Sequence, residues 1–222
     1  MSEVVKLQAT DGHQLDAYVA APSVKPLGAV VVVQEIFGVN QHIRSVADRF
    51  AQEGFYAVAP ALFDRVERGV ELSDTGDGMQ KGIALAQKIN IDEAVKDVDA
   101  ALQYAGKATG KPAGVVGYCY GGTLAWLSAT RLTPAAAVGY YGGHISKFAQ
   151  EKPHAPVLLH FGTQDSHIPQ DDIAKVQAAH PEVEICWYDA GHAFNNDTRA
   201  SYNEKAAREA GARTLAFLKR HL

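Results

Sequence analysis

The chain has 222 residues and a formal net charge of −4 at pH 7, without a concentrated basic run, so nucleic acid is not an expected partner. Hydrophobic residues make up 47% and charged residues 21%, which is ordinary globular composition and predicts one domain over residues 1–222. The sequence has no run of about 18 apolar residues, so no membrane span is expected.

The N-terminal residues and the two cysteines indicate in which cellular compartment the protein is expected. The first ten residues mix Glu3 and Lys6 with apolar residues and lack the basic-then-apolar order of a signal peptide. A core of this size needs no disulfide, so we expect Cys119 and Cys186 to be reduced thiols in a cytoplasmic protein. A disulfide between them is the alternative.

Strand and helix patterns alternate along the first half of the chain. Two strand-like runs flank the turn signal Asp11-Gly12 and predict an opening hairpin. A continuous β-branched run follows, as in strands that are buried on both faces. The expected elements are strands at 4–8, 15–20, 29–33 and 56–59, a helix at 42–52, and an irregular excursion at 62–89 that ends in a helix.

The same alternation continues in the second half. Asn90 and Glu93 resemble a capping box at the start of a helix, and Ser201 with Glu204 is expected to begin the last helix. Further helices are expected at 121–130 and 173–179, and strands at 114–118, 136–140, 157–161 and 183–188. This order predicts an α/β fold with a mostly parallel sheet, helices on both faces and function at the carboxyl ends of the strands.

One pentapeptide, Gly117-Tyr118-Cys119-Tyr120-Gly121, falls between a predicted strand and a predicted helix. This is the nucleophile-elbow pattern of α/β-hydrolases with cysteine in place of serine. Glycine is needed on both sides because a Cβ would clash in so tight a turn. The helix N-terminus favours the thiolate, so Cys119 is the expected nucleophile, and an inert buried thiol is the alternative.

A thiol nucleophile needs a base, and the base needs an orienting acid. Asp165 directly follows the strand at 157–161, and His192 follows the strand at 183–188, in the chain order of α/β-hydrolases. We therefore predict a Cys119-His192-Asp165 triad. His167 and Asp189 are rivals, but His167 shares a loop with the acid and Asp189 suits a turn. His160 is expected to be a core histidine.

Acyl transfer also needs donors for the developing oxyanion. The elbow supplies the backbone N–H of Tyr120, and the loop after the strand at 29–33 is expected to supply that of Ile36. Glu35 ends that buried strand, where an unpaired acid is costly. We predict that its carboxylate contacts the Cys119 thiol and controls the thiol proton, and a salt-bridged loop residue is the alternative.

Five stretches together resemble the dienelactone hydrolase (carboxymethylenebutenolidase) family: residues 34–40, 117–122 and 139–142, Gly162-x-Gln164-Asp165, and Gly191-His192-x-Phe194. The resemblance implies a minimal α/β-hydrolase without a large lid domain. It also implies a Cys-His-Asp triad that opens an ester or lactone through a thioester, and a glutamate at Glu35 that takes the thiol proton. No cofactor and no metal are implied, and Phe37 and Tyr140 match residues that line the family's pocket.

The sequence departs from the family in the arginines that hold the substrate carboxylate. One of these positions is Asn196 here, and the other falls near Met79, with Lys81 close by. We expect an altered carboxylate site, in which Asn196, Lys81 or Arg65 contacts the substrate and Arg68 and Arg199 are further candidates. The predicted function is therefore hydrolysis of a small ester or lactone, and dienelactone itself is left open.

Four other functions compete with this prediction. An acyl thioesterase or a general carboxylesterase would use the same residues. A glutamine amidotransferase would carry His-x-Glu downstream, where this chain has His192-Ala193-Phe194. A small-molecule-binding module on this scaffold would lack a triad member, and none is missing. The expected partner is a small ester or lactone, and the chain is expected to be a monomer or a small homo-oligomer.

Overall fold

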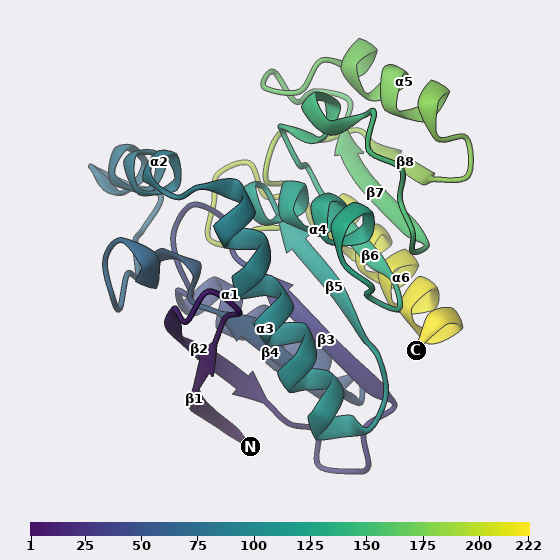
Figure 1. Cartoon of the computed structure of the whole chain (residues 1–222). Helices are drawn as coiled ribbons and strands as arrows, with labels where there is room; N and C mark the ends of the chain where they lie inside the picture. Colours follow the sequence, from purple (N-terminus) through teal and green to yellow (C-terminus); the bar gives the residue numbers. More distant parts are fainter.

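The strands of the computed structural model, which describes residues 1–222, form one sheet of eight strands (Figure 1). Their order across the sheet is β1-β2-β4-β3-β5-β6-β7-β8. They are β1 (Ser2–Gln8), β2 (Gln14–Ala20), β3 (Gly28–Val33), β4 (Phe55–Pro60), β5 (Ala113–Tyr118), β6 (Ala137–Tyr140), β7 (Val157–Gly162) and β8 (Glu184–Tyr188). Strand β2 pairs antiparallel with β1 and β4, and all other pairs are parallel, which confirms the predicted mostly parallel sheet.

The central strands are buried on both faces, which explains their continuous apolar composition. Every residue of β3 and of β5 is buried. The register pairs Tyr118 with Tyr140, and Gly162 with Tyr188. The carboxyl ends of β5, β6, β7 and β8 therefore reach the same edge of the sheet, so the loops that follow them meet there.

Helices cover both faces of this sheet. They are α1 (Gln41–Gln52), α2 (Gly78–Lys88), α3 (Ile91–Thr109), α4 (Tyr120–Arg131), α5 (Gln170–Ala179) and α6 (Glu204–His221). In Figure 1, α3 and α4 lie in front of the central strands, and α6 lies behind them. No helix is both long enough and apolar enough to cross a membrane.

Two helix starts differ in detail from the predicted ones. Asn90 caps α3 by accepting from the N–H of Asp92, but the Glu93 side chain lies 3.9 Å from Arg65 and does not close a capping box. The last helix is capped by Asn203, whose side chain accepts from the N–H of Ala206. The prediction that Ser201 begins this helix was therefore wrong, because an asparagine two residues later makes the cap bond.

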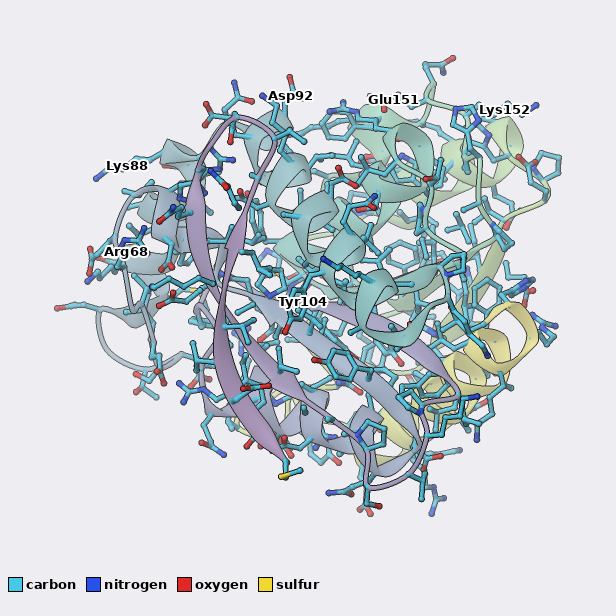
Figure 2. The ribbon with its side chains drawn as sticks, turned by 60° about the horizontal axis from the view of Figure 1, so that its bottom comes forward. Arg68, Lys88, Asp92, Tyr104, Glu151 and Lys152 are labelled. Atoms are coloured by element: carbon cyan, nitrogen blue, oxygen red, sulfur yellow. The ribbon has the colours of Figure 1, made fainter.

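The excursion at 62–89 contains the 3₁₀ helix η1 (Leu62–Arg65) and α2. The N–H of Leu72 donates to the carbonyl of Phe37, and Asn40 donates to the carbonyl of Leu72. These bonds tie the excursion to the loop after β3. Figure 2 shows Arg68 and Lys88 from this region at one side of the molecule, and Glu151 and Lys152 at the other.

Candidate active site

Cys119 stands at the turn between β5 and α4 with a φ of 53° and a ψ of −110°. A Cβ on Gly117 would lie 1.8 Å from the carbonyl oxygen of Gly121. A Cβ on Gly121 would lie 2.4 Å from the carbonyl oxygen of Val33. Both flanking positions therefore require glycine, and the turn holds the sulfur of Cys119 at the carboxyl end of the sheet.

His192 lies between this sulfur and the carboxylate of Asp165. Its Nε2 is 3.3 Å from Sγ of Cys119, and its Nδ1 is 2.7 Å from Oδ2 of Asp165. The three side chains come from the loops after β5, β7 and β8. The structure thus brings the three predicted triad residues together in the order sulfur, imidazole and carboxylate, which is the arrangement that nucleophilic acyl transfer requires.

The partners of His192 control its charge. Burial lowers the pKa of the imidazole, but the hydrogen bonds to Asp165 and then Cys119, together with their negative charges, raise it to about 10. At neutral pH the ring therefore carries a proton that it can share with the sulfur or deliver to a leaving group.

His167 and Asp189, the other candidates for the base and the acid, do not occupy those positions in the triad. The backbone N–H of His167 donates to Oδ1 of Asp165 at 2.8 Å, which fixes the carboxylate. The exposed His167 ring packs edge-on against His192, with ring centroids 5.4 Å apart. Asp189 accepts from Gln164 at 2.6 Å and does not contact His192.

Two backbone N–H groups next to Cys119 have no acceptor within the protein. They belong to Tyr120, the first residue of α4, and to Ile36, in the loop after β3. The Gly121 N–H donates to the carbonyl of Gln34 at 3.0 Å, so this loop is bound to the elbow. Gly82 of α2 packs so closely that a Cβ on it would lie 2.1 Å from the Ile36 carbonyl oxygen. The two donors are thus held in place and free to bind a developing negative charge.

Glu35 is buried with 2% exposure, and its Oε2 accepts from Nδ2 of Asn196 at 2.6 Å. Its Oε1 has no hydrogen-bond partner, and the carboxylate makes no hydrogen bond to Cys119. The predicted contact between Glu35 and the thiol is therefore not formed in this conformation. Asn196 is 1% exposed, and its side-chain amide binds Glu35. Asn196 had been predicted to contact the substrate.

Arg199 lies against Phe37, in the loop after β3 that carries Glu35 and Ile36. Its guanidinium carbon lies 5.7 Å from the centroid of the buried Phe37 ring. Its only ionic partner is Asp74, at 3.5 Å from Nε, which is longer than a good charged hydrogen bond. Most of the hydrogen-bonding capacity of this guanidinium is therefore unused.

The other basic candidates are engaged elsewhere. Lys81 donates to Glu67 at 2.6 Å on the surface. Arg65 binds the buried carboxylate of Asp97 through two nitrogens, at 2.7 and 2.8 Å, and also pairs with Asp11. The guanidinium of Arg65 thus neutralises a carboxylate that would otherwise be buried without a countercharge, and its contact with substrate stays a prediction.

Two adjacent tyrosines at the end of β6 face different parts of the molecule, and Tyr140 is the one that was expected to line the substrate pocket. Tyr140 directs its hydroxyl to Thr214 of α6 at 2.6 Å and lines a cleft between α1 and α6, away from Cys119. Tyr141 instead packs its ring on His192, at 5.2 Å between centroids. The sequence motif contains both residues, but nothing in it showed which of them faces the triad.

No group of three or more His, Cys, Asp or Glu side chains is arranged to hold a metal ion. Cys119 and Cys186 are both free thiols. The reacting groups that the site offers are thus the thiol, the imidazole, two carboxylates and two backbone N–H donors.

Comparison with known proteins gives consistent matches over the whole length. The family model described as the dienelactone hydrolase family matches residues 15–222. A carboxymethylenebutenolidase from Pseudomonas putida is 36% identical, covering 98% of this chain and 96% of the relative. The crystal structure of a candidate dienelactone hydrolase from Klebsiella pneumoniae is 34% identical with a TM-score of 0.84, covering 97% and 98% of the two chains. A dienelactone hydrolase-like promiscuous phosphotriesterase shares the fold at 20% identity and a TM-score of 0.77, with 99% and 98% covered.

Proposed function

The chain belongs to the dienelactone hydrolase family, and we propose that it cleaves a small ester or lactone with Cys119 as nucleophile, His192 as acid and base, and Asp165 as the orienting acid. The observation that carries this proposal is the continuous line of contacts, 3.3 Å from Sγ to Nε2 and 2.7 Å from Nδ1 to Oδ2. A hydrolase of this family acts on lactone or ester bonds, and these groups supply each step of such a reaction.

In the first step, the thiolate of Cys119 attacks the acyl carbon and the carbonyl oxygen becomes negative. The N–H groups of Tyr120 and Ile36 stabilise this oxygen. The carbon–oxygen bond to the alcohol portion then breaks, and the leaving oxygen takes the proton from Nε2 of His192. The product of this step is a thioester on Cys119 and a neutral imidazole.

In the second step, water hydrolyses the thioester. Acylation removes the negative charge from the sulfur, which is one of the causes of the raised pKa of His192. The neutral imidazole can then take a proton from water while the water oxygen attacks the thioester carbon. The bond between carbon and sulfur breaks, and the acid product leaves.

Where Cys119 carries its proton, we assign Glu35 to remove it, which gives the thiolate that pairs with the charged His192. In this role the carboxylate leaves Asn196, turns toward Cys119 and takes the proton as the substrate arrives, and it returns this proton to the sulfur when the thioester has been hydrolysed. Its burial supports the assignment, because a carboxylate that has one neutral donor and one free oxygen is poorly stabilised where it is. A thiol that reacts in this way must stay reduced, and we therefore place the protein in the cytoplasm.

We also propose that the carboxylate site is altered and that Arg199 is its cation. Asn196 occupies one of the expected arginine positions and is engaged with Glu35. The guanidinium of Arg199 lies over Phe37 with a single long ion pair to Asp74, so an anionic substrate can replace that partner. The favoured substrates are therefore esters or lactones with a carboxylate near the acyl group.

Turnover of p-nitrophenyl acetate by the parent and by Cys119→Ala tests the mechanism. We expect the variant to be inactive, and equal turnover would exclude Cys119 as the nucleophile. A screen of lactones, aryl esters and acyl thioesters then separates the lactonase from the carboxylesterase and thioesterase alternatives. Iodoacetamide should label Cys119 faster than Cys186, and the reverse order in peptide mapping would overturn the site assignment.

Paired substrates with and without a carboxylate test the role of Arg199. Arg199→Gln should raise KM roughly tenfold for the anionic substrate only, because one charged contact is lost. Lys81→Gln is the matched comparison, because its ammonium is already bound to Glu67. If Lys81→Gln raises KM for the anionic substrate and Arg199→Gln does not, Lys81 is the cation that binds the carboxylate.

A further inference from the structure

Only three residues other than glycine have a positive φ, and all three lie at this site. They are Cys119, Tyr141 and Ala193, with φ values of 53°, 40° and 60°. The elbow explains Cys119, and Ala193 is adjacent to His192. Tyr141 has no such role in the proposed reaction. A bulky residue in this region of φ is strained, and such strain concentrates at functional sites.

The side chain of Tyr141 is fully buried against the triad. Its ring lies 5.2 Å from that of His192 and 5.3 Å from that of Phe194. Its hydroxyl is buried and has no hydrogen-bond partner. Because nearly all buried hydroxyls are paired, an unpaired one beside a reactive group calls for a functional explanation.

A complementary unpaired atom belongs to Glu35. Its Oε1 is a buried acceptor without a donor, whereas its Oε2 is held by Asn196. Burial first, and then the negative charge of Glu35, hold the pKa of Tyr141 well above its usual range. The phenol therefore keeps its proton and remains a donor in the neighbourhood of a carboxylate that lacks one.

We propose that Tyr141 is a positioning residue for the thiol proton, whose hydroxyl donates to Oε1 of Glu35 when this carboxylate turns from Asn196 toward Cys119. The inference rests on the proposed function of Glu35 and deepens it. The S–H bond of Cys119 breaks and an O–H bond forms on one oxygen of Glu35. Tyr141 neither gains nor loses a proton, and it holds the other oxygen throughout.

Most other titratable groups on the surrounding elements are already paired or are part of the triad. The Tyr120 hydroxyl is also buried and unpaired, but the charges that act on its pKa are those of Asp97 and Arg65 and not that of Glu35. Cys119 and His192 bind each other. Arg49 of α1 pairs with Asp197, which also accepts from His42. Tyr118 of β5 is influenced by both Arg49 and Glu35, which lower and raise its pKa respectively, but burial is the main cause of its raised pKa. Tyr141 thus has the buried, unpaired hydroxyl whose pKa responds to the charge of Glu35.

The test is the pH dependence of kcat/KM in Tyr141→Phe, which keeps the ring and removes the hydroxyl. Losing a donor to a carboxylate raises the pKa of that carboxylate, so the acidic limb should move up by about one pH unit. Below that limb, kcat/KM should fall roughly tenfold, and it should change less at higher pH. An acidic limb that matches the parent's would overturn the proposal.

Tyr188→Phe is the matched control. It also removes a buried hydroxyl next to Phe194, but that hydroxyl is bound to His160 and Arg213. Its acidic limb should match that of the parent. An equal shift in both variants would show that loss of a tyrosine hydroxyl merely loosens the site, and would also overturn the proposal.

A double-mutant cycle with Glu35→Gln separates an action through Glu35 from a structural role. In the Glu35→Gln background, Tyr141→Phe should lower kcat/KM less than twofold, whereas equal losses in both backgrounds would contradict the link. The pH dependence of iodoacetamide labelling at Cys119 gives the same comparison without turnover. Absence of Cys119-dependent turnover in the parent would remove the proposed function, whereas normal turnover with an unshifted Tyr141→Phe profile removes only this inference.

Discussion

Two histidines of this protein are bonded at both ring nitrogens, one fully buried and one partly buried, yet their pKa values move in opposite directions. His192 contacts a carboxylate and a sulfur, and its pKa is raised to about 10 in spite of burial. The ring nitrogens of His160 of β7 bond only to the hydroxyls of Tyr188 and Thr214, and burial lowers its pKa to about 3. The charge of the partners, and not burial alone, decides which imidazole is charged and which is neutral.

The largest effect is expected when His192 is given a neutral partner, because its pKa should then move toward that of His160. Asp165→Asn removes the charge that stabilises the imidazolium, so His192 should come to resemble His160. We expect kcat/KM to fall by roughly 10³- to 10⁴-fold, as when the acid of a comparable triad is neutralised. Asp189→Asn is the matched control because it lies three residues before His192 and contacts Gln164 instead. A larger loss in the control would reassign the orienting acid.

A second change acts on the neutral histidine. Thr214→Val removes the hydroxyl that contacts both the Tyr140 hydroxyl, at 2.6 Å, and Nε2 of His160, at 3.0 Å. Two buried polar groups then lose a partner, so urea unfolding should show a loss of about 2 kcal/mol. Thr109→Val, at the end of α3, should cost clearly less because its hydroxyl bonds only to carbonyl groups. Equal losses in the two variants would show that the His160 contacts add nothing.

The third prediction uses pH to sharpen the contrast. Below its ordinary pKa of about 6.5, His160 gains a proton in the unfolded chain but not in the fold, so the unfolded state binds more protons. Stability should therefore fall as the pH drops from 6.5 toward 3, by at most about 1.4 kcal/mol per pH unit from this residue. Urea unfolding at pH 6.5, 5.5 and 4.5 should show a shallower slope for His160→Asn than for the parent. Parallel slopes would contradict the assigned neutral state.

The strands and helices, and their order along the chain, could be predicted because hydrophobic periodicity and turn residues are local signals. The opening hairpin, the Val-rich strands and the elbow around Cys119 all follow from short stretches of sequence. Chain order also placed Asp165 and His192 at strand ends, because parallel strands bring their carboxyl ends together. These predictions required no knowledge of side-chain contacts between distant segments.

The remaining features depend on such contacts. Asn196 holds Glu35 across 161 positions of sequence, and Arg65 reaches Asp97 on another helix, so no local pattern identified either pair. The positive φ of Tyr141 also carries no sequence signature, because most residues with such a φ are glycine. Tertiary context decided between Tyr140 and Tyr141, which are adjacent in the same motif.

The crowding at Gly117 and Gly121 bears on how this protein can be redesigned. A single added carbon at either position would meet backbone oxygen, at 1.8 and 2.4 Å, and backbone cannot yield as a flexible side chain does. Residue 119 already has a side chain at this turn, with a φ of 53°, so an unbranched replacement adds no new contact with this backbone oxygen. A mutant library aimed at new chemistry should therefore vary the nucleophile and its surroundings while leaving both glycines constant.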